Sequence, residues 1–126
     1  MLMLRPTLVL LCLVMPALAD ESPWLGDWAA DPDWCAQAGR TGEVPEAPLR
    51  ITDSEFLGYE NRCRITETDP LQILPGAELV LECVAEGESF ADARLLVIDA
   101  ADSMLMLVPG AEPLRLSRCP DGTAAE

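Results

Sequence analysis

The fold is decided by residues 77–119, which read AELVLECVAEGESFADARLLVIDAADSMLMLVPGAEPLRLSRC. Four short apolar segments, at 79–84, 93–98, 104–108 and 114–116, alternate with three groups of Gly, Pro, Asp, Glu and Ser. These polar and small residues favour reversal of an extended backbone, whereas the apolar segments have the length of strands. The stretch therefore predicts an antiparallel meander.

The residues before this stretch extend the predicted sheet. Residues 49–52 alternate as a half-buried strand, and 56–66 lead through a turn into a further strand. Residues 32–38 predict one short helix, because Asp31 suits its N-cap, Pro32 its first position and Gly39 its end. A meander of this size must protect its edges. We therefore expect an all-β fold, a small antiparallel meander that closes into a six- to seven-stranded barrel with one short N-terminal helix and two disulfides.

The N-terminus has the features of a secretory signal peptide over residues 1–19. Arg5 precedes an apolar run at 8–14, and Ala17-Leu18-Ala19 forms a cleavage site with small residues. The apolar run ends at Pro16, well short of the ~20 residues that a membrane-spanning helix needs. We expect cleavage near Ala19, a single domain over residues 20–126, and a location in the bacterial periplasm or outside the cell, without membrane insertion of the mature chain.

Four cysteines remain after cleavage, and strand register predicts how they pair. If strands 61–67 and 79–85 form a hairpin, Cys63 faces Cys83, Ile65 faces Leu81 and Arg64 can pair with Glu82. Opposed residues in an antiparallel pair lie within reach of a disulfide. Cys35 then pairs with Cys119 by elimination. A four-cysteine zinc site would need closely spaced ligands, and no two of these cysteines are so close.

Charge and composition exclude several classes of function. The predicted mature chain keeps seven of the eight basic residues and all 22 acidic ones, a formal charge of −15. This charge argues against nucleic-acid binding and against binding to anionic membranes. The chain has no His and no Lys, and its mature cysteines are expected in disulfides. We therefore expect a protein that is not an enzyme, with no catalytic residues, no metal and no cofactor.

Two segments are candidates for interaction with a protein partner. All three Trp residues lie between 24 and 34, and we expect Trp28 and Trp34 to plug the barrel, with Trp24, nearest the tail, as the exposed interface anchor if any tryptophan is exposed. The loop at 69–76 carries Leu71, Ile73 and Leu74 between two prolines, although hairpin connections are normally polar. These aliphatic side chains either fold back over the barrel mouth or present an apolar tip.

Gly26-Asp27-Trp28, near the start of this exported β domain, resembles the G-x-W signature of the calycins, the lipocalin-like barrels. The arrangement is also similar to the small bacterial inhibitors of secreted metalloproteases. The resemblance implies that Trp28 closes one barrel end and that a basic residue of the last strand, Arg115 or Arg118, packs on it. It also implies that an N-terminal tail, here residues 20–24, enters the cleft of a protease.

Three functions are consistent with the sequence. The first is a binding or inhibitor-like module that acts through the N-terminal Trp segment and the 69–76 loop. The second is an accessory subunit of an envelope complex. The third is a carrier of a small apolar ligand, held in a barrel lined by Leu96, Met104 and Met106.

Overall fold

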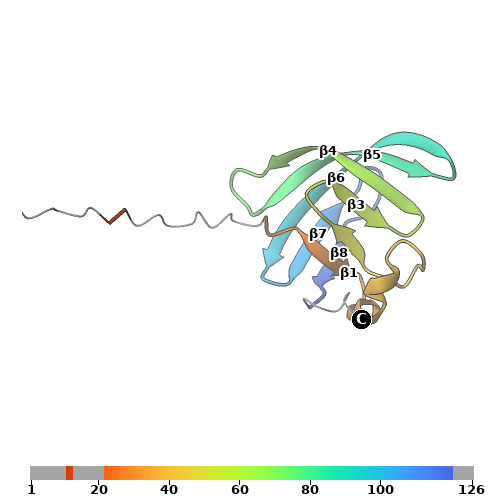
Figure 1. Cartoon of the computed structure of the whole chain (residues 1–126), viewed down its shortest axis with the longest axis horizontal. Helices are drawn as coiled ribbons and strands as arrows, with labels where there is room; N and C mark the ends of the chain where they lie inside the picture. The colour runs from red at the N-terminus through yellow and green to blue at the C-terminus, as the bar shows by residue number, and fades with distance from the viewer. Residues whose placement is uncertain (1–10, 13–21, 121–126) are drawn as a thin grey trace, which may run out of the picture.

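Eight antiparallel strands close into one barrel in the computed structural model, which describes residues 11–12 and 22–120 (Figure 1). Each strand pairs with the next along the chain, and the last pairs with the first. The strands are β1 (Gly26–Ala29), β2 (Leu49–Ile51), β3 (Glu55–Gly58), β4 (Asn61–Pro70), β5 (Gly76–Ala85), β6 (Glu88–Ala100), β7 (Ser103–Leu107) and β8 (Leu114–Arg118). The expected all-β antiparallel barrel is confirmed.

The expected strand number of six to seven is wrong, because β1 is an additional strand. Its four residues are too few for an alternating pattern to be visible in the sequence. What makes this segment a strand is pairing with distant partners, since Trp28 lies opposite Leu49 of β2 and opposite Arg118 of β8. The β1–β8 ladder closes the barrel.

Parts of the N- and C-terminal segments are not covered by this description. Apart from Leu11 and Cys12, the expected signal peptide lies outside the described residues, as do the expected new N-terminus at Asp20 and residues 121–126. Among residues 11–12 and 22–120, no helix has the length and apolar character needed to cross a bilayer.

The β4–β5 hairpin has the register expected from the sequence. Cys63 lies opposite Cys83 and Ile65 opposite Leu81, and the two cysteines form a disulfide. On the outer face, Arg64 and Glu82 form an ion pair at 2.7 Å. A β-bulge then shifts the register between Ile65 and Glu67, which lets the long strands twist and curve.

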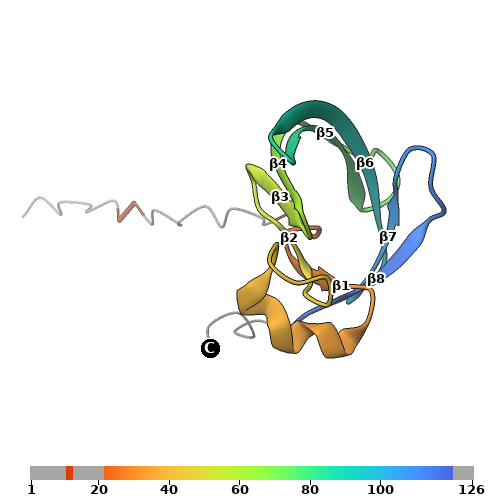
Figure 2. The same ribbon diagram turned by 90° about the vertical axis from the view of Figure 1, so that its right-hand side faces the viewer.

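The expected short helix is present as the 3₁₀ helix η1 (Pro32–Arg40), two residues longer than expected. The Asp31 side chain accepts a hydrogen bond from the Asp33 amide at 2.9 Å, which caps the helix. The helix lies outside the barrel, below β1 and β2 (Figure 2). The Cys35–Cys119 disulfide links it to the residue that follows β8.

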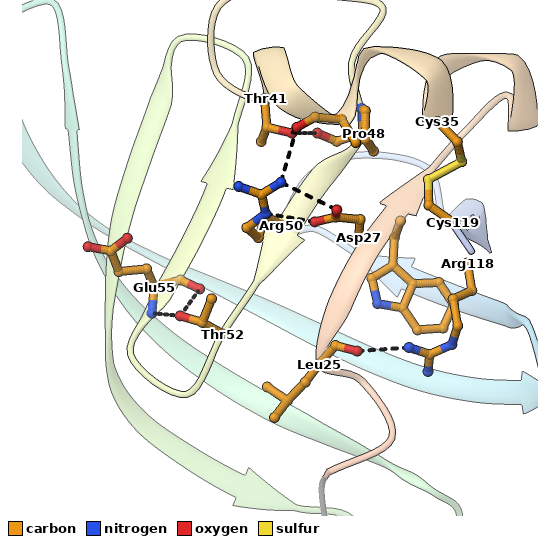
Figure 3. A network of polar contacts seen from close by, with 12 residues as sticks. Leu25, Asp27, Cys35, Thr41, Pro48, Arg50, Thr52, Glu55, Arg118 and Cys119 are labelled. Carbon is orange, nitrogen blue, oxygen red and sulfur yellow. Dashed lines mark hydrogen bonds and ion pairs between the residues drawn. A yellow bond between two sulfur atoms is a disulfide. The ribbon is translucent and has the colours of Figure 1, made fainter. Parts of the chain in front are cut away.

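A partly buried ion pair also holds η1 against the barrel wall (Figure 3). Arg50 of β2 contacts Asp27 of β1 at 2.8 Å and donates a hydrogen bond to the Ala38 carbonyl at 3.0 Å. The hydrogen bond with Asp27 raises the pKa of Arg50 against the opposing effect of burial. The Thr41 hydroxyl contacts the carbonyl oxygens of Ala38 and Pro48. Asp27, the middle residue of the G-D-W sequence, therefore positions the helix.

The barrel interior is filled by side chains from every strand. Trp28 is fully buried there, as expected. Trp34 does not plug the barrel, and this expectation was wrong. Because η1 lies outside the wall, Trp34 is only partly buried and packs against Ala29, Cys35 and Cys119.

Candidate functional site

The strand pairing assigns each connection to one of the two ends of the barrel. One end, which we call the N-terminal end, is formed by residues 22–25 and by the turns at 52–54, 71–75 and 101–102. The opposite end, the helix end, is formed by residues 30–48 and by the connections at 59–60, 86–87 and 108–113. Figure 1 shows the chain entering the barrel beside the β4–β5 turn. The two candidate interaction segments therefore lie at the same end.

The β4–β5 turn is braced by backbone contacts at both of its sides. The Leu71 amide donates to the Gly76 carbonyl at 3.0 Å, and the Ile98 amide of β6 donates to the Pro75 carbonyl at 2.9 Å. Gly76 has a φ of +153°, and an added Cβ would lie 2.0 Å from the Leu96 carbonyl oxygen. Only glycine fits at this close approach to β6.

The three aliphatic side chains of this turn have different environments. Ile73 is 94% exposed and Leu74 is 55% exposed, so these two form an apolar tip. Leu71 is partly buried and folds back against Gly76. The sequence left open whether these side chains fold back or form an exposed tip. Leu71 folds back, whereas Ile73 and Leu74 form the tip.

Trp24, the tryptophan that the sequence favoured as an exposed interface anchor, is instead buried. Its relative exposure is 7%, and its carbonyl accepts a hydrogen bond from Trp28 Nε1 at 3.0 Å. The Leu25 amide donates to the Ser22 carbonyl, which turns the chain at this point. The turn brings the Trp24 ring back into the core cluster with Trp28. Trp24 is thus an anchor for the N-terminal segment and offers little surface to a partner.

Arg118 of β8 fixes the same segment from the other side (Figure 3). Its guanidinium lies 4.3 Å from the centre of the Trp28 ring, within the range of a cation–π contact. It donates hydrogen bonds to the carbonyl oxygens of Leu25, at 2.8 Å, and of Pro23. Arg115, the other basic residue considered for this role, instead pairs with Asp99 on the outer face. Hydrogen bonds from Arg115 and Ser103 lower the pKa of Asp99.

These contacts create a rigid support for an exposed apolar tip. Ile73 and Leu74 project from a turn held by two backbone hydrogen bonds, and residues 22–25 are held by Trp28 and Arg118. Exposed aliphatic groups on an ordered turn lose little entropy on binding, which suits them for contact with a protein surface.

A buried ion pair in the barrel wall was missed by the sequence analysis. Arg94 of β6 is only 8% exposed, contacts Asp92 at 2.8 Å and lies over the Phe56 ring at 5.4 Å. Burial raises the pKa of Asp92, but hydrogen bonds from Arg94 and the Ala93 amide lower it more, so the net pKa is below its ordinary value. Arg94 Nε has no hydrogen-bond partner among the described residues. The sequence signal that could have revealed this pair is the alternation along β6, which places Asp92 and Arg94 on the same face of the strand as the buried Leu96.

The described residues offer no alternative centre for metal chemistry. In residues 11–12 and 22–120, no group of three His, Cys, Asp or Glu side chains converges to hold a metal ion.

No protein-family model, curated protein or solved structure matches the chain.

Proposed function

We propose that this chain is a small exported binding module of the bacterial periplasm, inhibitor-like and without enzymatic activity. In this proposal the N-terminal end of the barrel contacts a protein partner, with Ile73 and Leu74 at the centre of the interface and residues 22–25 beside them. The observation that carries the proposal is the 94% exposure of Ile73 on a turn fixed to β6. A protein that gained nothing from this apolar tip would bury it or replace it with polar residues.

Two features support the resemblance to calycins and to inhibitors of secreted metalloproteases. The eight strands follow each other in simple order around a closed barrel. A tryptophan of the first strand is covered by an arginine of the last one. In the inhibitors the N-terminal tail acts on the protease, and here residues 22–25 lie at the same end of the barrel as the apolar tip (Figure 1). Both segments would then contact one partner.

Export of the mature chain is part of the proposal. Two disulfides, Cys35–Cys119 and Cys63–Cys83, suggest an oxidising compartment. If the chain is instead an accessory subunit of a larger envelope complex, it would use the same surface. Stoichiometric co-purification with several subunits would distinguish this role from binding to a single partner.

The carrier function has less support. Leu96 and Met104 are fully buried, and Met106 is nearly so, in one cluster with Trp28 and Leu116. These side chains pack against each other, whereas a carrier needs them to line a cavity. Binding of an apolar ligand would require this core to open.

Affinity capture from an envelope extract of the source bacterium tests the proposal. The bait is the mature domain with both disulfides, compared with an Ile73→Ser/Leu74→Ser variant. A matched control, Tyr59→Ser/Leu114→Ser, removes two exposed apolar side chains from the helix end. The parent and the control should recover the same protein in stoichiometric amounts, and the tip variant should lose it. Equal recovery by all three baits would contradict the proposed site.

A further inference from the structure

Strand β6 has a long edge that no neighbouring strand covers. Of its 13 residues, Glu88 to Val97 pair with β5, and the Ile98 amide donates to the Pro75 carbonyl in the β4–β5 turn. Pairing with β7 begins only at Leu95, opposite Leu107. Within residues 22–120, no strand pairs with the other side of Glu88–Arg94. Figure 2 shows the β7–β8 hairpin separating from the β5–β6 ribbon.

The backbone of this edge is only partly occupied. The Ala93 amide donates to the Asp92 side chain at 2.8 Å, and the Ala93 carbonyl accepts from Arg94 Nη1 at 2.7 Å. The amide and the carbonyl of Ala93 therefore both point away from β5, toward the open side of β6. Because backbone direction alternates along a strand, Ser89 and Ala91 direct their amides and carbonyls to the same side. The Asp92–Arg94 pair protects only Ala93, and Ser89 and Ala91 remain exposed.

A groove lies at the fork where β7 leaves β6. It has a volume of about 380 Å³, its apolar lining includes Val80, Leu95, Leu107 and Pro109, and it is also lined by Arg94, which is paired with Asp92. Two carboxylates, Asp69 and Glu78, lie at its rim directly opposite each other in the β4–β5 ladder. Like charges in opposed positions are unfavourable. A cation supplied by a partner would remove this repulsion.

We propose that the β6 edge, Glu88–Arg94, binds an extended basic segment of a partner protein by strand addition. The added strand takes the place that β7 leaves, its backbone pairs with Ser89 and Ala91, and one apolar side chain enters the groove. A Lys or Arg two positions from that side chain, and therefore on the same face of the added strand, lies toward Asp69 and Glu78. A second copy of this chain fits less well, because the edge carries Glu88 and Asp92 and the whole chain has a formal charge of −14.

The β6 edge is a different surface from the apolar tip. Ser89 and Ala91 lie toward the helix end, whereas Ile73 and Leu74 lie at the N-terminal end, and only the carboxylates Asp69 and Glu78 of the proposed site lie near the β4–β5 turn. One partner could contact both surfaces, but each surface has its own test, and the failure of one leaves the other unaffected.

Synthetic peptides test the proposal directly on the full mature domain. The probes are the octapeptide Lys-Ser-Val-Ser-Lys-Ser-Val-Ser, called the Lys-Val peptide, which presents Lys and Val on one face of a strand, and its counterpart with Glu in place of Lys, called the Glu-Val peptide. Two further Lys-Val peptides are N-methylated at every Ser or at every Lys and Val. Backbone amide signals are followed by NMR during titration. The Lys-Val peptide should shift the signals of Ser89 and Ala91, the Glu-Val peptide should bind at least tenfold more weakly, and one of the two N-methylated peptides should lose binding. N-methylation blocks one backbone edge of the peptide and leaves the protein unchanged.

A pair of protein variants provides the matched control. Ala91→Pro removes an amide that faces the open side and no ladder bond to β5, so the fold should persist. It should weaken Lys-Val binding at least tenfold, whereas Ala91→Ser and Ile73→Ser/Leu74→Ser should stay within twofold of the parent. Equal binding of all four peptides, or shifts that avoid residues 88–94, would overturn the proposal. A dimer in sedimentation that Ala91→Pro dissociates would also overturn it, in favour of self-pairing.

Discussion

Arg118 lies directly opposite Trp28 in the ladder that closes the barrel, and its guanidinium covers the Trp28 ring at 4.3 Å. Only two register pairs join β8 to β1, Trp28 with Arg118 and Ala29 with Ser117. Closure of the barrel therefore depends on side-chain contacts in addition to the backbone ladder. The same arginine holds the carbonyl oxygens of Pro23 and Leu25, so closure and the position of the N-terminal segment are coupled.

We predict that Arg118→Ala lowers the free energy of unfolding by about 2–3 kcal/mol. About 1 kcal/mol comes from the lost cation–π contact, and the rest from two backbone carbonyls that lose a charged donor. Arg118→Lys should recover less than half of this loss, because an ammonium cannot stack on the ring and reach both carbonyls. Urea unfolding followed by Trp fluorescence measures all three proteins. A loss below about 0.5 kcal/mol for Arg118→Ala would show that the contact is not important for closure.

The two disulfides should differ in their contribution to stability. Cys35 and Cys119 are 84 residues apart, and Cys63 and Cys83 are 20 apart. The chain-entropy model assigns about 4.6 kcal/mol to the longer loop and about 3 kcal/mol to the shorter one. Replacing Cys35 and Cys119 by Ser should therefore cost more than replacing Cys63 and Cys83. Denaturant titration of the two double variants gives the comparison, and the reverse order would contradict this prediction.

Gly76→Ala should destabilise the protein strongly, because the new Cβ would lie 2.0 Å from the Leu96 carbonyl oxygen. We expect a loss of about 3 kcal/mol or more. Gly87→Ala is the matched control, since Gly87 also has a positive φ, +79°, but has open space around it. Its loss should be about 1 kcal/mol, from backbone strain alone. Thermal unfolding of both variants measures the difference, and equal losses would mean that β5 can move away from β6 at no cost.

Stability should fall in acid partly through Asp92. Its pKa in the folded protein is lowered, chiefly by Arg94 and the Ala93 amide acting against burial. The contribution of Asp92 is therefore complete above its unfolded pKa of about 3.9 and is lost as the pH falls through the lower folded pKa. At pH 7, Asp92→Asn should reduce the free energy of unfolding by about 1–3 kcal/mol, because Arg94 loses its charged partner.

Urea titrations between pH 7 and pH 2.5 check this prediction. The difference between the parent and Asp92→Asn should be constant from pH 7 to about pH 5 and should become smaller below about pH 4. Asp99 also has a lowered pKa, but it is present in both proteins, so its effect on the free energy of unfolding cancels in the difference. A difference that stays constant into acid would show that the Asp92–Arg94 pair does not stabilise the fold.

The parts of the fold that depend on local pattern could be predicted from the sequence. Alternation of Leu79, Leu81 and Cys83 identified the buried face of β5, and the hairpin register brought Cys63 opposite Cys83. Asp31 and Pro32 marked the start of η1. These features depend on residues that are near each other in the sequence or directly opposed in one hairpin.

The features that depend on distant segments could not be predicted in this way. β1 is a strand because β2 and β8 pair with it, and nothing within its four residues shows this. Trp24 is buried because a turn at Ser22 returns its ring to the core, and Trp34 is outside because η1 lies beyond the wall. The open edge of β6 depends on where β7 ends, which composition does not show.

Site-specific photo-crosslinking in cells tests the proposed binding site most directly. A photoreactive phenylalanine analogue replaces Ile73 in one strain and Leu114, an exposed residue of the helix end, in another. Irradiation should link position 73 to one discrete protein, with no equivalent product from position 114. Products of equal yield from both positions, or none from position 73 when the folded domain is present, would contradict the proposal that the N-terminal end of the barrel binds a partner.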